Sequence, residues 1–194
     1  LADTFAAEVL YWEEDICRWS EEHDMDPNLI ATVMQIESCG NPDAVSATGV
    51  RGLFQVTGAN LDGENPFDPN VSMAKGPGKV LKYELNEAGG DIRAAMAGYN
   101  GGPFARDLIA GKLSESQFLY KLIYHPSRIW NTWGKARAKL NEVQYYARWA
   151  NIYFEAQEGK RDTLQAWLDK GGQRLCTEAQ AVQNATPRPL AQAQ

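Results

Sequence analysis

Glu37 is the residue whose setting most clearly suggests acid–base chemistry. It lies in the segment MQIESCGNPDAVSATGVRGLFQ, where an apolar helical pattern gives way to a loop rich in Gly, Pro, Ser and Asn. Helical spacing places it on the same face as four apolar residues, Leu29, Ile30, Val33 and Met34, so it continues a buried stripe. Burial disfavours the charged form of a carboxyl group and raises its pKa. Such a group can hold a proton near neutral pH and deliver it to a leaving oxygen.

Taken with the helix alone, a glutamate such as Glu37 more often forms a salt bridge or points into solvent beyond the helix end. The neighbouring loop favours a site, because short polar side chains follow at Ser38, Asn41, Ser46, Thr48 and Gln55. Hydroxyl and amide groups of this kind suit sugar hydroxyls and N-acetyl groups, and the loop glycines let the backbone approach a ligand closely.

A second polar segment, AGYNGGP, places Tyr99 and Asn100 at the end of another predicted helix. By themselves, a Tyr at such a position is usually core and an Asn is usually a cap.

The elements that must position these residues are predicted to be helices. One apolar stripe predicts a helix over residues 4–22, and Asp26, Pro27 and Gly40 mark the start and stop of the next. Residues 41–69 read as loop. Further helices are expected over 71–88 (interrupted at KGPGK), after Asp91 until 100–103, and over 104–113, 114–124, 135–157 and 161–170. We therefore expect an all-α fold with little or no β structure, forming a single domain over residues 1–176 with a flexible tail over 177–194.

Composition excludes several classes of function. The 194 residues carry a net charge of −6 with a pI near 5.0, which argues against nucleic acid and against an anionic membrane surface as partner. The apolar stretches are shorter than the roughly 20 residues that a membrane span needs. His23 and His125 lack metal-ligand spacing, so no metal and no cofactor are expected.

Cys17, Cys39 and Cys176 allow three single disulfide pairings, each of which leaves one thiol free. The sequence does not choose among them, Cys17 with Cys39 included, and three buried free thiols are an equal alternative.

The loop and its flanking helices resemble the soluble lytic transglycosylase family. IESCGNPDAVSATGVRGLFQV is similar to the family signature E-S-x-x-N-P-x-A-x-S-x-x-G-A-x-G-L-M-Q. The segment from NPFDPN to AGYNGGP is similar to the block ending in A-Y-N-x-G, and NEVQYYARWANIYF weakly resembles a later E-T-x-x-Y block. The resemblance covers about residues 26–155.

This resemblance implies a lysozyme-like helical fold, here with extra N- and C-terminal helices, that acts on the glycan strands of peptidoglycan. The family cleaves the β-1,4 bond between N-acetylmuramic acid and N-acetylglucosamine without water and leaves a 1,6-anhydro sugar. Glu37 matches the catalytic acid/base. The positions matching substrate-contacting residues are Ser46, Thr48, Gln55, Tyr99, Asn100 and Tyr146.

The sequence departs from the family pattern at four positions. Phe54 replaces Met, Val50 and Gly98 replace Ala, and Val143 replaces Thr, so Tyr146 is the least secure of these assignments. A single catalytic carboxyl departs from ordinary glycoside hydrolysis, which uses two. The loop acids Asp43, Asp62, Glu64 and Asp68 are expected to make turns and face solvent.

Two alternatives remain open at this point. One is a goose-type lysozyme-like hydrolase that uses water, with Asp62 or Asp68 as base; the other is an inactive glycan-binding module of a wall-spanning assembly, and any partner in such machinery is unknown. Access to peptidoglycan implies a periplasmic or extracellular location, with which a disulfide would agree.

Overall fold

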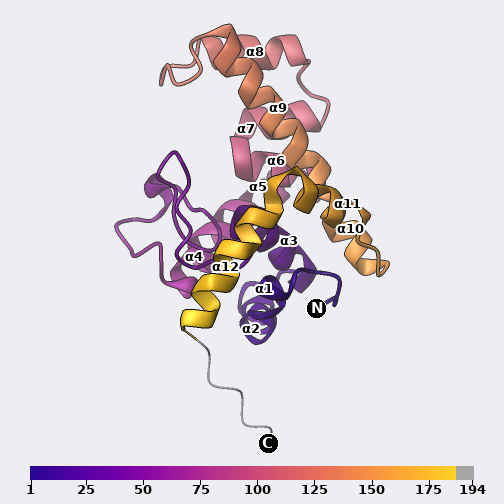
Figure 1. Ribbon diagram of the computed structural model, residues 1–194. Helices are drawn as coiled ribbons and strands as arrows, with labels where there is room; N and C mark the ends of the chain where they lie inside the picture. The colour runs from indigo at the N-terminus through magenta and orange to yellow at the C-terminus, as the bar shows by residue number, and fades with distance from the viewer. Residues whose placement is uncertain (187–194) are drawn as a thin grey trace, which may run out of the picture. The chain divides into compact units, whose positions relative to one another are not determined.

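The computed structural model describes residues 1–186, and nearly all regular structure in it is helical (Figure 1). The predicted all-α fold is therefore confirmed. Within the described residues, β structure is limited to isolated antiparallel bridges that pair Arg51 with Val45 and with Val56. None of the described helices combines the length and the apolar character needed to cross a bilayer.

The chain forms two compact units, and the predicted single domain over residues 1–176 includes residues of both. Unit 1 comprises residues 1–77 and the C-terminal residues from 155 on. Its helices are α1 (Ala7–Leu10), α2 (Glu13–His23), α3 (Pro27–Ser38), η1 (Gly58–Asn60), α4 (Pro69–Lys75), α11 (Asp162–Trp167), η3 (Leu168–Gly172) and α12 (Gln173–Ala185).

Unit 2 comprises residues 78–154. Its helices are α5 (Lys82–Glu87), α6 (Ile92–Gly101), α7 (Pro103–Ile109), α8 (Glu115–Ile123) and α9 (Trp133–Trp149). The π-helix η2 (Gly76–Leu81) and the helix α10 (Asn151–Gln157) contain the two boundaries between the units.

The apolar stripe predicted near the N-terminus forms part of the core of unit 1. Its five residues, Phe5, Val9, Trp12, Ile16 and Trp19, are all at most 4% exposed. The helix is not continuous as predicted, because Trp12 has non-helical dihedral angles that separate α1 from α2. The indole N–H of Trp12 donates to the Gly40 carbonyl at 2.8 Å, which ties this break to the end of α3.

The C-terminal helix α12 packs against α1 and α3 (Figure 1). A disulfide joins Cys39, at the end of α3, to Cys176 in α12, while Cys17 is free and exposed. The Cys17–Cys39 pairing is therefore wrong. The flexible tail predicted from residue 177 is also wrong as far as Ala185, because the apolar face of α12 is buried through Cys176 and Ala179. The rest of that tail, residues 187–194, lies outside the described residues.

Removing this disulfide is expected to destabilise the protein by about 2–5 kcal/mol, because the bond closes a long loop, with 137 residues of sequence separation. The change is Cys39→Ser with Cys176→Ser, and the measurement is the free energy of unfolding in urea. Cys17→Ser is the matched control and should leave stability unchanged. Equal stability of the double variant and the control would contradict the assignment of the bond as a structural link.

The interruption predicted at KGPGK is the π-helix η2. A π-helical turn holds more residues than an α-helical turn, so it shifts which residues of α5 face inward. Leu81 and Glu84 are buried whereas Tyr83 is 54% exposed. The wide turn therefore places a carboxylate in the interior of unit 2.

Candidate active site

Glu37 lies in the last turn of α3 and is half-buried. The helix begins as predicted, with the Asp26 side chain accepting a hydrogen bond from the Asn28 N–H, and ends at Cys39 in the left-handed conformation. The neighbouring Ser38 is fully buried, and its hydroxyl donates to the Leu53 carbonyl at 2.7 Å. This bond joins the helix end that carries Glu37 to the loop that carries Gln55.

Hydrogen bonds from segments distant in sequence also hold the end of α3. The Gln183 side-chain amide of α12 donates to the carbonyl oxygens of Gly40 (3.0 Å) and Glu8 (2.8 Å). A Cβ on Gly40 would lie 2.3 Å from the Glu8 carbonyl oxygen, so glycine is required for this close approach. These contacts fix the backbone that follows Glu37 at the end of α3.

Gln55 is presented to the surface by a tightly anchored loop. Its neighbours Phe54 and Val56 are buried, while Gln55 itself is half-buried and has a left-handed φ of +48°. Its Nε2 donates to the carbonyl oxygens of Gly52 at 2.9 Å and Ala44 at 3.2 Å. Since the amide nitrogen is used to hold the loop, the amide oxygen is the group that Gln55 can offer to a ligand.

Two buried contacts position this loop. The Phe54 N–H donates to the hydroxyl of Ser72 in α4 at 3.1 Å, and the Phe54 ring packs edge-on against Trp19 of α2 with centroids 6.0 Å apart. Phe54 is thus a core residue. Gly52 has a φ of +86°, and a Cβ there would lie 2.0 Å from the Pro66 carbonyl oxygen.

Ser46 and Thr48 lie in the same loop, with their hydroxyl oxygens 3.1 Å apart. The Ser46 hydroxyl also accepts a hydrogen bond from the Val50 N–H. Thr48 is exposed and Ser46 is half-buried, so both remain accessible. Unit 1 therefore contains Glu37, Gln55 and this hydroxyl pair on two directly bonded segments.

Three of the four loop acids have structural roles, although two of them form ion pairs that the sequence did not predict. Asp62 and Glu64 bind the Lys75 ammonium at 2.9 and 2.7 Å, and their hydrogen bonds, that of Glu64 first, raise the pKa of Lys75. Asp68 caps α4 by accepting hydrogen bonds from the N–H groups of Asn70 and Val71.

The remaining sequence-predicted residues belong to unit 2. Tyr99 and Asn100 are half-buried in the last turn of α6, and Tyr146 is buried on α9, which packs against α6. The Lys139 ammonium of α9 donates to the Asn100 side-chain oxygen at 3.1 Å.

The contact between α6 and α9 is close at Gly101, where a Cβ would lie 3.0 Å from the Val143 side chain. Val143 and Tyr146 share a face of α9 because they are three residues apart. The face of α9 that packs on the end of α6 therefore carries Tyr146 as well, and Val143 serves as a packing residue where the family pattern has Thr.

Sequence reasoning missed a buried ion pair that lies against Gly98 of α6. The Arg106 guanidinium donates to the Glu84 carboxylate at 2.8 Å, and both side chains are less than 10% exposed. Burial alone would lower the pKa of Arg106, but the hydrogen bond and charge of Glu84 raise it above its ordinary value. The only signal in the sequence is Gly98: a Cβ there would lie 2.3 Å from a Glu84 carboxylate oxygen.

The Gly98→Ala substitution is expected to destabilise the protein by about 1–3 kcal/mol, because the added methyl group must displace the paired Glu84 carboxylate. Thermal unfolding followed by circular dichroism measures this. Gly134→Ala is the matched control, since Gly134 lies in α9 and a Cβ there would meet no atom within 4 Å. A Gly98→Ala protein as stable as the control would contradict tight packing at this position.

A mainly helical fold with a half-buried glutamate at a helix end, bonded to a glycine-rich polar loop, is what the sequence resemblance implied. Comparison with known families agrees with it. The chain belongs to the Transglycosylase SLT domain family, which matches residues 14–117.

Several curated proteins are similar to this chain. A transglycosylase of Enterobacteria phage PRD1 is 36% identical over 97 residues, which is 48% of this chain and 36% of the phage protein. The membrane-bound lytic murein transglycosylase F of Shewanella loihica is 29% identical over 189 residues, covering 88% of this chain and 38% of that protein. The membrane-bound lytic murein transglycosylase F of Stutzerimonas stutzeri is 33% identical over 147 residues, which is 71% of this chain and 28% of that protein.

The matched part of this chain thus covers between 28% and 38% of the length of these relatives. No solved structure matches it significantly.

Proposed function

We propose that this protein is a peptidoglycan lytic transglycosylase that cleaves the β-1,4 bond between N-acetylmuramic acid and N-acetylglucosamine without water. The observation that carries the proposal is the placement of Glu37, half-buried at the end of α3, which is bonded through Ser38 to the loop holding Gln55. Membership of the Transglycosylase SLT domain family supports it.

In the proposed reaction, protonated Glu37 gives its proton to the glycosidic oxygen, and the bond from that oxygen to C1 of the muramic acid breaks. The N-acetyl oxygen of the substrate stabilises C1. The Glu37 carboxylate then takes the proton of the C6 hydroxyl as O6 bonds to C1, which regenerates Glu37 and forms the 1,6-anhydro ring. An internal hydroxyl competes well with water because its effective concentration is very high.

The substrate-binding roles proposed for this chain follow the same assignment. The Gln55 amide oxygen and the hydroxyls of Ser46 and Thr48 suit N-acetyl and sugar hydroxyl groups. Tyr99, Asn100 and Tyr146 are proposed to bind the glycan from unit 2.

The structural roles of the loop acids argue against the hydrolase alternative. Asp62 is paired with Lys75, and Asp68 is committed to capping α4, so neither is placed as a free base to activate water. The single-acid mechanism is therefore the better supported of the two.

The test is incubation with purified peptidoglycan sacculi, followed by mass spectrometry of the released sugars. The proposal expects muramic acid ends that are one water lighter than the reducing sugar. Reducing muramic ends would instead show hydrolysis, and sacculi left intact would favour the glycan-binding module. A protein that meets peptidoglycan acts in the cell envelope, and we propose a periplasmic or extracellular location for it.

A further inference from the structure

Large apolar side chains are exposed together where α8 leads into α9. Tyr120, Tyr124, Ile129 and Trp133 are each between 59% and 70% exposed, and they account for most of the exposed large hydrophobic residues in the described chain. The rings of Tyr120 and Tyr124 lie against each other with centroids 4.5 Å apart. We call this region, residues 115–137, the α8–α9 surface. Large apolar groups exposed along one short segment in this way are typical of interaction sites.

The same surface is basic in a chain that is acidic as a whole. Lys121, Arg128, Lys135 and Arg137 are all exposed, and there is no Asp or Glu between Glu115 and Glu142. Residues 104–141 carry seven Lys or Arg and two Asp or Glu, a net charge of +5. The rest of the chain carries 12 and 23, a net charge of −11. Because the rest of the chain is acidic, an anionic partner would be attracted to the α8–α9 surface and repelled by the remainder.

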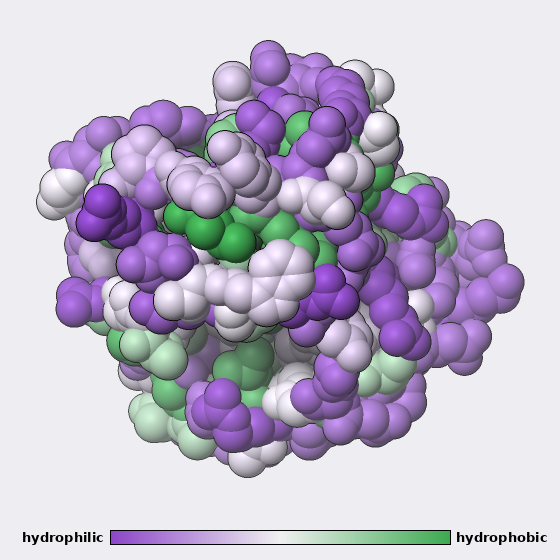
Figure 2. Space-filling view, turned by 90° about the horizontal axis from the view of Figure 1, so that it is seen from above, coloured by the Kyte–Doolittle hydropathy of each residue, from purple (hydrophilic) through white to green (hydrophobic). Residues whose placement is uncertain are grey.

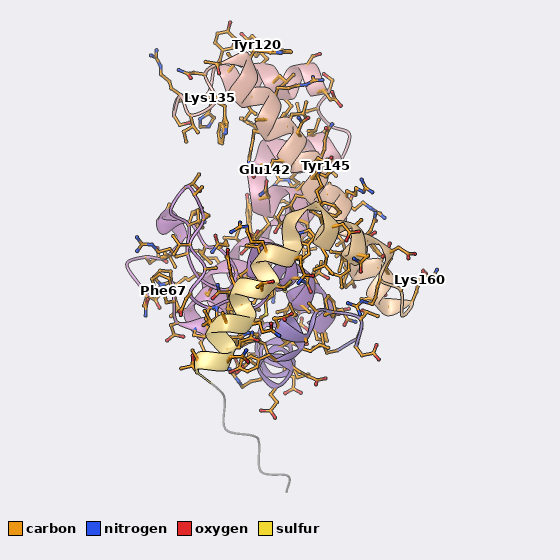
Figure 3. The ribbon with its side chains drawn as sticks, viewed as in Figure 1. Phe67, Tyr120, Lys135, Glu142, Tyr145 and Lys160 are labelled. Carbon is orange, nitrogen blue, oxygen red and sulfur yellow. A yellow bond between two sulfur atoms is a disulfide. The ribbon has the colours of Figure 1, made fainter. Side chains whose placement is uncertain are left out.

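An open hollow of about 530 Å³ lies within this surface. Its walls are mostly carbon and include the rings of Phe104, Tyr120 and Tyr124, with the Lys121 ammonium 4.8 Å from the centroid of the Phe104 ring. Figure 2, which looks down on the end of Figure 1 that carries α8, shows apolar surface exposed in hollows between pale and hydrophilic side chains. In Figure 3, Tyr120 and Lys135 project from this end of unit 2.

We propose that the α8–α9 surface binds an anionic phospholipid membrane. Tyr and Trp are the residues favoured at the boundary between headgroups and acyl chains, and Lys and Arg beside them pair with lipid phosphates. Charge complementarity favours an anionic surface. The exposed Ile129 and the carbon-lined hollow favour one with an apolar layer beneath it, since isoleucine offers no ring on which a sugar could stack. This proposal departs from the expectation drawn from the net charge of −6, because that total conceals the local basic patch.

The test is flotation of the protein with phosphatidylcholine vesicles containing about a third phosphatidylglycerol, with pure phosphatidylcholine vesicles for comparison. We expect binding to the anionic vesicles alone, weakened by salt. Each cation near such a surface contributes about fivefold to partitioning, so Lys121→Gln with Arg128→Gln and Lys135→Gln should weaken binding roughly a hundredfold. Trp133→Ala should weaken it independently of charge.

The matched control is Lys160→Gln with Lys170→Gln and Arg174→Gln, which removes three exposed cations from unit 1 and should retain binding. Thermal unfolding of each variant establishes that it is folded. Failure to bind anionic vesicles, or an equal loss in the control, would overturn the proposal. The proposal would also be overturned if the triple variant of Lys121, Arg128 and Lys135 bound vesicles normally but lost binding to lipid-free peptidoglycan sacculi. That result would show that the surface binds the carboxylates of the wall. Because the vesicles contain no glycan, the result is independent of the proposed catalytic function.

Discussion

The Glu37→Gln variant is expected to lose between about 10² and 10⁴ of kcat on purified sacculi, which is the usual contribution of one general acid/base. The amide keeps the size of the side chain but can neither donate the proton to the leaving oxygen nor accept the one from the C6 hydroxyl. In the proposed mechanism both steps use the same group, so no other acid of the loop is expected to replace it. The measurement is the rate of release of anhydro-muropeptides.

The matched control is Glu87→Gln, which changes an exposed glutamate of α5 in the same way and should keep the parental rate. Sedimentation with sacculi should show that the Glu37→Gln protein still binds glycan, since the loop hydroxyls and Gln55 are unchanged. Parental release by the Glu37→Gln variant would remove this residue from the mechanism.

The local setting of Glu37 could be predicted because it depends on short-range rules. Asp26 as the N-cap, Pro27 in the first turn and Gly40 after the end are signals encoded within one helix, and the structure contains them all. The apolar spacing also predicted the helix itself, but not its full burial, because every residue from Leu29 to Ile36 is buried rather than one face alone.

The support behind that helix could not be predicted, because it comes from contacts distant in sequence. Nothing near Cys39 indicates that its partner is Cys176, and the Ala- and Gln-rich composition of α12 is typical of a tail. The helix is held by the disulfide and by two hydrogen bonds from Gln183. The family match ends at residue 117, so this chain uses a segment beyond it to fix the end of α3.

The interior of unit 2 shows a second limit of sequence reasoning. Glu84 has the appearance of a solvated helix residue, and only the extra residue in the π-helical turn of η2 carries it inward. Once buried, the carboxylate requires a partner, and Arg106 supplies it from α7. The departure at Gly98 follows from this pair, because a larger residue would occupy the space of the carboxylate.

Arg106→Met is expected to destabilise the protein by about 3–5 kcal/mol, since it leaves the Glu84 carboxylate buried without its partner. Methionine retains most of the volume of the arginine stem, so the loss of stability arises from the missing charge more than from lost packing. The measurement is the free energy of unfolding in urea.

The double variant Glu84→Leu with Arg106→Met distinguishes the effect of the two charges from the effect of the space that the side chains fill. Apolar replacement of both partners of a buried pair is often neutral or stabilising, so the double variant should recover most of the stability lost in Arg106→Met. If it does, the activity of the double variant on sacculi shows whether the pair also positions Tyr99 and Asn100 for substrate. An Arg106→Met protein as stable as the parent would show that the buried Glu84 side chain does not depend on Arg106 as its partner.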